Sequence, residues 1–429
     1  MQAFILVLMT EIMCGEFLVG ALGLPSILKF LPEAMSAMVL VYVIFVGTRD
    51  RFHLIAPKYW ISFSALVVVM LCGIANNPAG TGPMLTGVRF FLRAVPLFFL
   101  PAVLPQTAAQ LKRQMQLLLV LCLAQLPIAV YQRWVMFQRE HSSGDAIRGT
   151  LLDSGFLSMT LISAVLVLTG LLLRGRISKL AYGVLFLLLL LPTTINETKG
   201  TIVFLPVCLF VTLIFGAKRS ERLRYALMGA GALMIFGSIF VPIYNAMEVY
   251  NPYKEERDIT NYFTHEKNLR RYMSSNVSGV GAREQGVRRS DAIMVPLQYL
   301  AKDPVRLAFG LGLGSVSSGN LGSIFKGDYF AIFEPFLILS FTFFLLEIGI
   351  FGLAIIGVLF WMVFRDTLVV AQEDDTLTGA LAAGWLGVVA LVAIAIAYNA
   401  VHESTPITYL YAYFSGLICA RRVALAHGN

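Results

Sequence analysis

The chain consists almost entirely of long apolar runs joined by short polar connections, as in LAYGVLFLLLLLPTT at 180–194 and TIVFLPVCLFVTLIFG at 201–216. Of its 429 residues, 58% are hydrophobic and 14% are charged. A soluble domain carries about 25% charged residues. Apolar runs of about 18 residues are long enough to cross a bilayer as helices. The sequence therefore predicts an all-α polytopic membrane protein, and the continuous runs exclude the alternating strands of an outer-membrane barrel.

The apolar runs predict about twelve transmembrane helices. Their approximate bounds are 3–23, 34–48, 60–76, 88–104, 114–134, 155–174, 178–195, 200–216, 225–245, 346–364, 379–398 and 404–420. Residues 333–345 are predicted to form a short re-entrant or interfacial segment before the tenth span. The chain then divides into nine helices over 1–245, a large polar loop over 246–332, and the last three helices with the re-entrant segment over 333–429. The first run lacks a basic n-region and a cleavage site, so it is expected to be retained.

Cysteine and histidine are placed in a way that implies neither disulfides nor a metal. Cysteines occur only inside apolar runs, where they are expected to be small core residues. His141, His265 and His402 show no spacing typical of metal ligands. No metal and no cofactor are therefore expected.

Basic residues concentrate on alternate connections, which the positive-inside rule assigns to the cytoplasm. These residues are Arg49, Arg51, Lys58, Lys112, Arg113, Arg174, Arg176, Lys179, Lys218, Arg219, Arg222, Arg224, Arg365, Arg421 and Arg422. The pattern predicts that both termini are cytoplasmic. The hairpin tip INETKGTIV at 195–203, which contains Glu197 and Lys199, then faces outward with the long loop.

Several basic residues nevertheless fall on the outward side, where they oppose insertion. They are Lys29, Arg89, Arg93, Arg133, Arg139, Arg148 and Lys199. Each one could anchor to lipid phosphate by snorkelling. As a set they indicate a basic outward-facing cavity that receives an anionic ligand.

Charged residues also occur inside the predicted spans, namely Glu11, Glu16 and Glu347. Intramembrane carboxylates are costly and usually face a bundle interior or a wet cavity. Arg89 and Arg93 are four residues apart and share one helical face. Two interpretations remain open for this pair: an internal ion pair such as Glu16 with Arg93, or an arginine held free to bind phosphate.

The long loop contains one predicted helix and one glycine-rich turn. GVRRSDAIMVPLQYLAKDP at 286–304 has apolar residues at Ile293, Leu297 and Leu300, which predicts an amphipathic helix that ends at 302–304. FGLGLGS at 309–315 has no following Lys-Ser/Thr and no preceding strand. It therefore predicts a tight turn near a cavity rather than a nucleotide site.

Four segments occur in an order that is typical of one family. They are RGTLLDSGFLSM at 148–159, TINETKGTI at 194–202, RRSDAIMVPLQYLAKDPVRLAFGLGLGS at 288–315 and EPFLILSFTFFLLEIGIFGL at 334–353. With the predicted spans, they resemble the O-antigen polymerase and ligase superfamily, which comprises Wzy-like and WaaL-like proteins of bacterial surface-polysaccharide assembly. Ligases of that family carry a His-Asn pair where Glu334-Pro335 stands here, which favours the polymerase branch.

The resemblance implies a GT-C-like fold in the bacterial inner membrane, with its active face in the periplasm. A polymerase of this kind transfers glycan from undecaprenyl pyrophosphate to the non-reducing end of another lipid-linked repeat unit, without a metal. The implied partners are this lipid-linked oligosaccharide, membrane lipid and a chain-length-regulating membrane protein, but no nucleic acid. A ligase that acts on lipid A-core or protein, and a polysaccharide flippase or other transporter, remain alternatives.

The resemblance also implies site residues. The family's basic residue at the hairpin tip corresponds to Lys199, and an Arg-x-x-Gly-like segment stands at Arg148. The implied pyrophosphate-binding residues are Arg89, Arg93, Arg148, Lys199, Arg288 and Arg289. The implied general base is Glu334, or else Glu197. Glu334 could instead be a simple helix-start residue, because Pro335 suits a first helical position.

Overall fold

The computed structural model describes residues 1–50, 52–136, 146–196, 198, 200–247, 287, 289–319 and 322–428. Within these ranges the chain is helical and contains no β-strand, only an isolated bridge between Ser318 and Lys326. The predicted all-α class is therefore confirmed.

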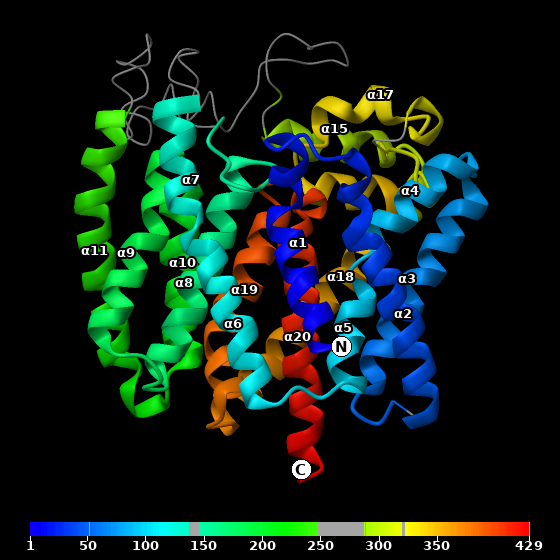
Figure 1. Cartoon of the computed structure of the whole chain (residues 1–429). Coiled ribbons are helices and arrows are strands. Elements are labelled where there is room, and N and C mark those ends of the chain that lie inside the picture. The colour runs from blue at the N-terminus through cyan, green and yellow to red at the C-terminus, as the bar shows by residue number, and fades with distance from the viewer. Residues whose placement is uncertain are drawn as a thin grey trace.

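The helices before the long polar loop run up and down through a single bundle (Figure 1). Their bounds are α1 Gln2–Gly20, α2 Leu31–Asp50, α3 Pro57–Asn76, α4 Thr81–Leu92, α5 Val95–Val103, α6 Ala108–Leu123, α7 Gln125–Tyr131, α8 Ser154–Leu173, α9 Lys179–Ile195, α10 Gly200–Gly216 and α11 Arg222–Met247.

The helices in the second part of the long polar loop and those after it complete the same bundle. Their bounds are α15 Arg289–Leu300, α16 Pro304–Phe309, α17 Phe330–Phe333, α18 Ser340–Glu373, α19 Leu377–Ile396 and α20 Thr405–Ala426. The α15 helix lies where the amphipathic helix was predicted, although of Ile293, Leu297 and Leu300 only Leu300 is fully buried. Its Ala292 and Leu300 are buried, and the Ala292 carbonyl accepts a 2.6 Å hydrogen bond from Thr342 of α18. The helix therefore lies on the bundle.

Eight of the described helices are long and apolar enough to cross a membrane, or nine if the α4–α5 pair, bent by 42°, is one broken span. The chain is thus a multi-pass membrane protein, but this count is below the predicted twelve. The difference lies in α9 and α10, which are apolar but only 17 residues long, and in α20. Tyrosines and the Arg421-Arg422 pair lower the mean hydropathy of α20.

Residues 333–345 were predicted to form a short segment before a span from 346. In the structure α18 begins at Ser340 and is broken at Gly349, where φ is +65°, so a short helical piece precedes a longer one. A Cβ at Gly349 would meet the backbone of Ala308 and Gly310. Glycine is therefore needed at the break, because it has no side chain and adopts positive φ readily.

The centre of the bundle is built by close contact between small residues. The α19 helix packs against α8, α10 and α18. Where α8 crosses α19, Gly170 faces the backbone of Ala380 and Gly384. Small residues let helix backbones approach closely, which is how transmembrane helices commonly associate.

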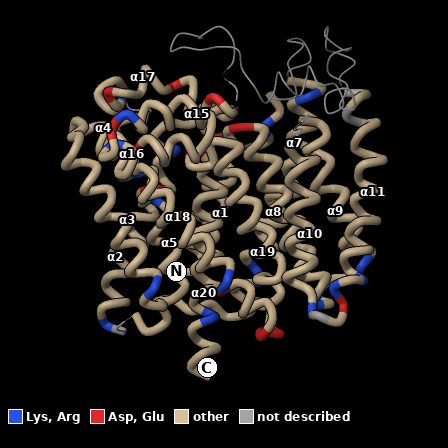
Figure 2. The backbone as a smooth tube through the Cα atoms, turned by 180° about the vertical axis from the view of Figure 1, so that it is seen from behind, with Lys and Arg blue, Asp and Glu red and all other residues tan. Residues whose placement is uncertain are grey.

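Lysine and arginine residues gather at the end of the bundle where the chain ends (Figure 2). The α8–α9, α10–α11 and α18–α19 connections lie at this end, which is called the basic end below (Figure 1). The opposite end, which carries α15 and α17, is called the α15 end. The described basic residues on alternate connections therefore lie together, as the sequence predicted.

Candidate functional site

The connection between α19 and α20, residues 397–404, is the place where distant segments meet at the α15 end. Arg93 donates from Nη2 to the His402 carbonyl at 2.6 Å. Arg289 donates from Nε to the Tyr398 carbonyl at 3.1 Å, and the Ser340 amide donates to the Asn399 carbonyl at 2.9 Å. The ends of α4 and the starts of α15 and α18 are thus tied to one turn.

Two of the predicted arginines share one carboxylate on this face. Arg89 donates from Nη2 and Nε to Glu33 Oε1 at 2.7 and 3.1 Å, and Arg93 Nη1 lies 3.5 Å from the same oxygen. Glu33 lies in the first turn of α2. The suggested pairing of Glu16 with Arg93 is wrong, because Glu16 binds Lys29 at 2.7 Å. Two cations against one carboxylate leave the trio with a net positive charge.

Arg93 is enclosed by the protein, whereas Arg89 keeps an accessible edge. The Arg93 side chain is 4% exposed, that of Arg89 26%. The Arg93 guanidinium lies 5.6 and 5.7 Å from the ring centres of Phe90 and Tyr409, within the range of cation–π attraction. This geometry fits the structural interpretation of Arg93.

His402 is a buried part of the turn, and the sequence predicts no role for it. Its amide donates to Ser340 Oγ at 2.9 Å, and its Nδ1 lies 3.0 Å from the same hydroxyl. The imidazole stacks on Phe343 at 4.1 Å between ring centres. Burial, followed by the nearby Arg93 charge, lowers the pKa of His402 to about 3. The ring is therefore neutral near pH 7.

Acidification is expected to destabilise the protein through His402. Below the ordinary pKa of 6.5 the unfolded chain takes up a proton that the folded chain excludes until about pH 3. Folding stability should fall by about 1.4 kcal/mol per pH unit in this window. His402→Asn keeps a polar side chain without a titrating ring, so its apparent unfolding temperature in detergent should fall less between pH 7.5 and 5.5. Equal slopes for both proteins would contradict this account.

Arg289 and the start of α10 both contact Tyr398. The Arg289 guanidinium lies 3.9 Å from the ring centre of Tyr398. Phe204 also meets this ring edge-on, at 4.9 Å between ring centres, and a Cβ at Gly200 would lie 3.4 Å from it. Gly200, which follows the α9–α10 hairpin tip, therefore contacts the same turn as Arg289.

Asn196 fixes the other side of this hairpin tip. It is fully buried and donates from Nδ2 to the Ser154 carbonyl at 3.0 Å and to Ser158 Oγ at 3.1 Å. Its Oδ1 accepts from the Thr198 amide at 3.2 Å. The hairpin is thereby anchored to the start of α8.

Several residues of the sequence analysis lie outside the described ranges. They are Glu197, Lys199 and Arg288 among the predicted site residues, together with Arg51, Arg139, His141, His265 and the stretch 248–286 of the long loop.

Arg148 lies on a tightly held loop before α8. Gln132 Oε1 accepts from the amides of Arg148 and Gly149 at 3.1 and 2.8 Å, and Gln132 Nε2 donates to the Gly149 carbonyl at 2.8 Å. The Arg148 side chain is exposed and makes no hydrogen bond or ion pair with any described residue. The start of α8 also abuts the turn, because a Cβ at Gly155 would lie 2.9 Å from Asn399 Nδ2.

Glu334, the predicted general base, is exposed and begins the short 3-10 turn η8 (Glu334–Phe336) with Pro335 behind it. Its carboxylate has no hydrogen-bond or ion-pair partner within the described part of the chain. This position fits the helix-start interpretation.

Glu347 is fully buried and holds the glycine-rich segment FGLGLGS in place. Its carboxylate accepts from the Gly314 amide, from the Val316 amide at 2.9 Å and from Ser317 Oγ at 3.0 Å. Gly310, Gly312 and Gly314 have φ of +79°, +90° and +90°, so the predicted tight turn is confirmed.

The segment is packed between helices instead of lining a cavity. A Cβ at Gly312 would meet the carbonyl of Gly73 in α3 and that of Asn77, the residue that follows α3. A Cβ at Gly314 would meet the Pro83 carbonyl of α4. These glycines therefore serve close backbone contact.

Glu33, Ser340 and His402 were not predicted to act together. Glu33 follows a proline at the start of an apolar run. This is a signal for the start of a helix, but it does not indicate that Glu33 pairs with the arginines. Across the described ranges, no group of three His, Cys, Asp or Glu residues could hold a metal ion. No protein-family model matches the chain, and no curated protein matches its sequence.

Proposed function

We propose that the protein is a Wzy-like polysaccharide polymerase that transfers glycan from undecaprenyl pyrophosphate to the non-reducing end of another lipid-linked repeat unit. One observation carries the proposal. Parts of all four segments that resemble the polymerase and ligase family, although far apart in sequence, meet at or beside the 397–404 turn. Each segment contributes one residue that contacts this turn, namely Gly155, Gly200, Arg289 and Ser340.

The proposal includes an orientation in the bacterial inner membrane. The basic end lies in the cytoplasm with both termini, as the positive-inside rule requires, and the α15 end faces the periplasm. We further propose that α9, α10 and α20 also cross the membrane and that the α4–α5 pair forms one broken span. The chain then has twelve spans in a GT-C-like arrangement.

The proposed reaction places negative charge where the outward cations lie. The acceptor hydroxyl attacks the anomeric carbon, a new glycosidic C–O bond forms, and the bond to the lipid pyrophosphate breaks. A carboxylate, Glu334 or Glu197, takes the hydroxyl proton. Fixed cations stabilise the departing pyrophosphate, so the reaction is proposed to need no metal.

The candidate cations differ in how accessible they are. Arg148 is exposed on a loop that Gln132 holds still, and Arg89 keeps part of its side chain open. Arg93 is enclosed and supports the site by holding the 397–404 turn. Lys199, Arg288 and Arg289 complete the proposed set.

The direct test is to incubate the purified protein with lipid-linked repeat units in the presence of a chelator. A ladder of longer glycans on the lipid is expected. Transfer only to lipid A-core would replace the polymerase with a ligase. Movement of the lipid across liposomes without any transfer would overturn the enzymatic proposal.

Arg148→Ala is expected to slow ladder formation about 100-fold, because one cation of the proposed set is lost while the loop stays held through its backbone. Arg148→Lys keeps the charge and should lose less. The initial rate of ladder formation measures both. Arg113→Ala, an exposed arginine at the basic end, is the matched control and should behave like wild type. An Arg148→Ala enzyme at full rate would remove Arg148 from the site.

A further inference from the structure

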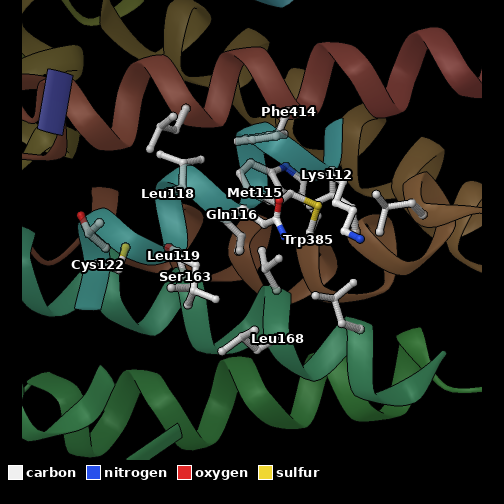
Figure 3. A pocket seen from close by; sticks show the side chains of 18 of the residues that line it. Lys112, Met115, Gln116, Leu118, Leu119, Cys122, Ser163, Leu168, Trp385 and Phe414 are labelled. Atoms are coloured by element: carbon white, nitrogen blue, oxygen red, sulfur yellow. The ribbon is translucent and has the colours of Figure 1, made fainter. Parts of the chain in front are cut away.

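A long cavity of about 660 Å³ lies between α6, α8, α19 and α20. Its wall is mostly aliphatic and aromatic, with Leu119, Leu168, Trp385 and Phe414 among the lining side chains (Figure 3). The volume falls within the range of about 300–1,000 Å³ that is typical of ligand pockets. The lining chemistry selects a hydrocarbon rather than a sugar.

The cavity is elongated along the helices. It is lined by Leu377 at the first residue of α19 and by Val392 near the other end of that helix. At 1.5 Å per residue these positions are about 22 Å apart along the axis. A cavity of this length, parallel to the helices, suits an extended acyl chain.

Positive charge stands at the basic end of the cavity. Lys112 of α6 and Arg176, just beyond α8, both line it. Lys112 makes no hydrogen bond or ion pair with any described residue. Arg176 donates to the Asp375 carbonyl at 2.7 Å and has no carboxylate partner in the described part of the chain. Both charges are thus available to an anionic group.

The opposite end of the cavity has the reverse character. There Pro406 is shared with a small pocket that Glu11, Glu16, Glu403 and Lys29 line. Lys29 is already bound to Glu16 at 2.7 Å. Three carboxyl groups against one ammonium disfavour an anionic headgroup at this end.

We propose that the cavity binds an anionic phospholipid from the leaflet at the basic end, with an acyl chain between the four helices and the headgroup phosphate against Lys112 and Arg176. Charge complementarity selects this occupant. The tail of a polyprenyl pyrophosphate would require its headgroup at the carboxylate-rich end. No residue of the 397–404 turn lines the cavity, and the proposal does not depend on glycan transfer.

Native mass spectrometry of the full chain in detergent tests the proposal with phosphatidylglycerol and phosphatidylcholine of identical acyl chains. The wild-type protein should retain phosphatidylglycerol in preference. Lys112→Gln should weaken its binding about fivefold, the usual effect of one lysine near an anionic lipid. Arg113→Gln is the matched control, because Arg113 is adjacent in sequence but does not line the cavity.

Ala164→Phe provides a second, independent arm. Ala164 lines the cavity, and a larger side chain there should reduce retention of both lipids without changing the charge. Equal binding of the two lipids to wild type, or equal losses in Lys112→Gln and Arg113→Gln, would overturn the proposal. The proposal would also be overturned if the wild-type protein retained an added polyprenyl phosphate, the Ala164→Phe protein lost it and the Lys112→Gln protein kept it.

Discussion

Lys199→Ala is expected to reduce the proposed glycan transfer by about 100- to 1,000-fold, the usual cost of removing one charge-stabilising group from an active site. In the resembling family the hairpin tip carries a basic residue at this position. In the sequence, Lys199 follows Asn196, which is hydrogen-bonded to the start of α8, and precedes Gly200, which lies against Tyr398. Lys199→Arg should retain activity, because it keeps the positive charge.

The measurement is the initial rate of ladder formation at equal amounts of purified protein. Lys179→Ala, an exposed lysine at the basic end, should match wild type and serves as the control. Full activity of Lys199→Ala would show that Lys199 does not stabilise the leaving pyrophosphate. A loss in both Lys199→Ala and Lys199→Arg would assign it a role other than charge.

Glu347→Leu is expected to destabilise the fold by at least about 3 kcal/mol. The carboxylate is fully buried and receives hydrogen bonds from Gly314, Val316 and Ser317. Leucine would leave these three donors buried without an acceptor, at about 1–3 kcal/mol for each. Glu347→Gln keeps one acceptor oxygen and should lose less.

The unfolding temperature in detergent, followed by intrinsic fluorescence, measures this loss. Glu373→Gln is the matched control on the same helix, because Glu373 is exposed and should shift stability by less than about 0.5 kcal/mol. A Glu347→Leu protein as stable as wild type would mean that the glycine-rich segment is held by other contacts.

Most of the helices in the bundle could be predicted from the sequence, because each long apolar run by itself predicts one helix. The bounds of α3, α8, α9 and α10 lie within a few residues of those predicted. The break at Gly349 could not be predicted, since a glycine in an apolar helix is common and only the contact with Ala308 and Gly310 makes it necessary here.

The site was less predictable than the bundle. Helical spacing correctly put Arg89 and Arg93 on one face, but their partner came from α2, because nothing in the spacing tells Glu33 from Glu16. The role of Ser340 with His402 was missed for the same reason. These residues are far apart in sequence and become neighbours only when the start of α18 packs against the α19–α20 connection.

The contacts that hold the FGLGLGS segment also decide whether the chain can be divided into separate folding units. Its glycines rest against α3 and α4, which precede the long polar connection, while its amides are held by Glu347, which follows it. The stretches before and after that connection therefore share one interior and are not separate folding units. Neither stretch alone would complete the contacts that enclose this segment, so the divisions at 245 and 332 are boundaries of topology and not of autonomous domains.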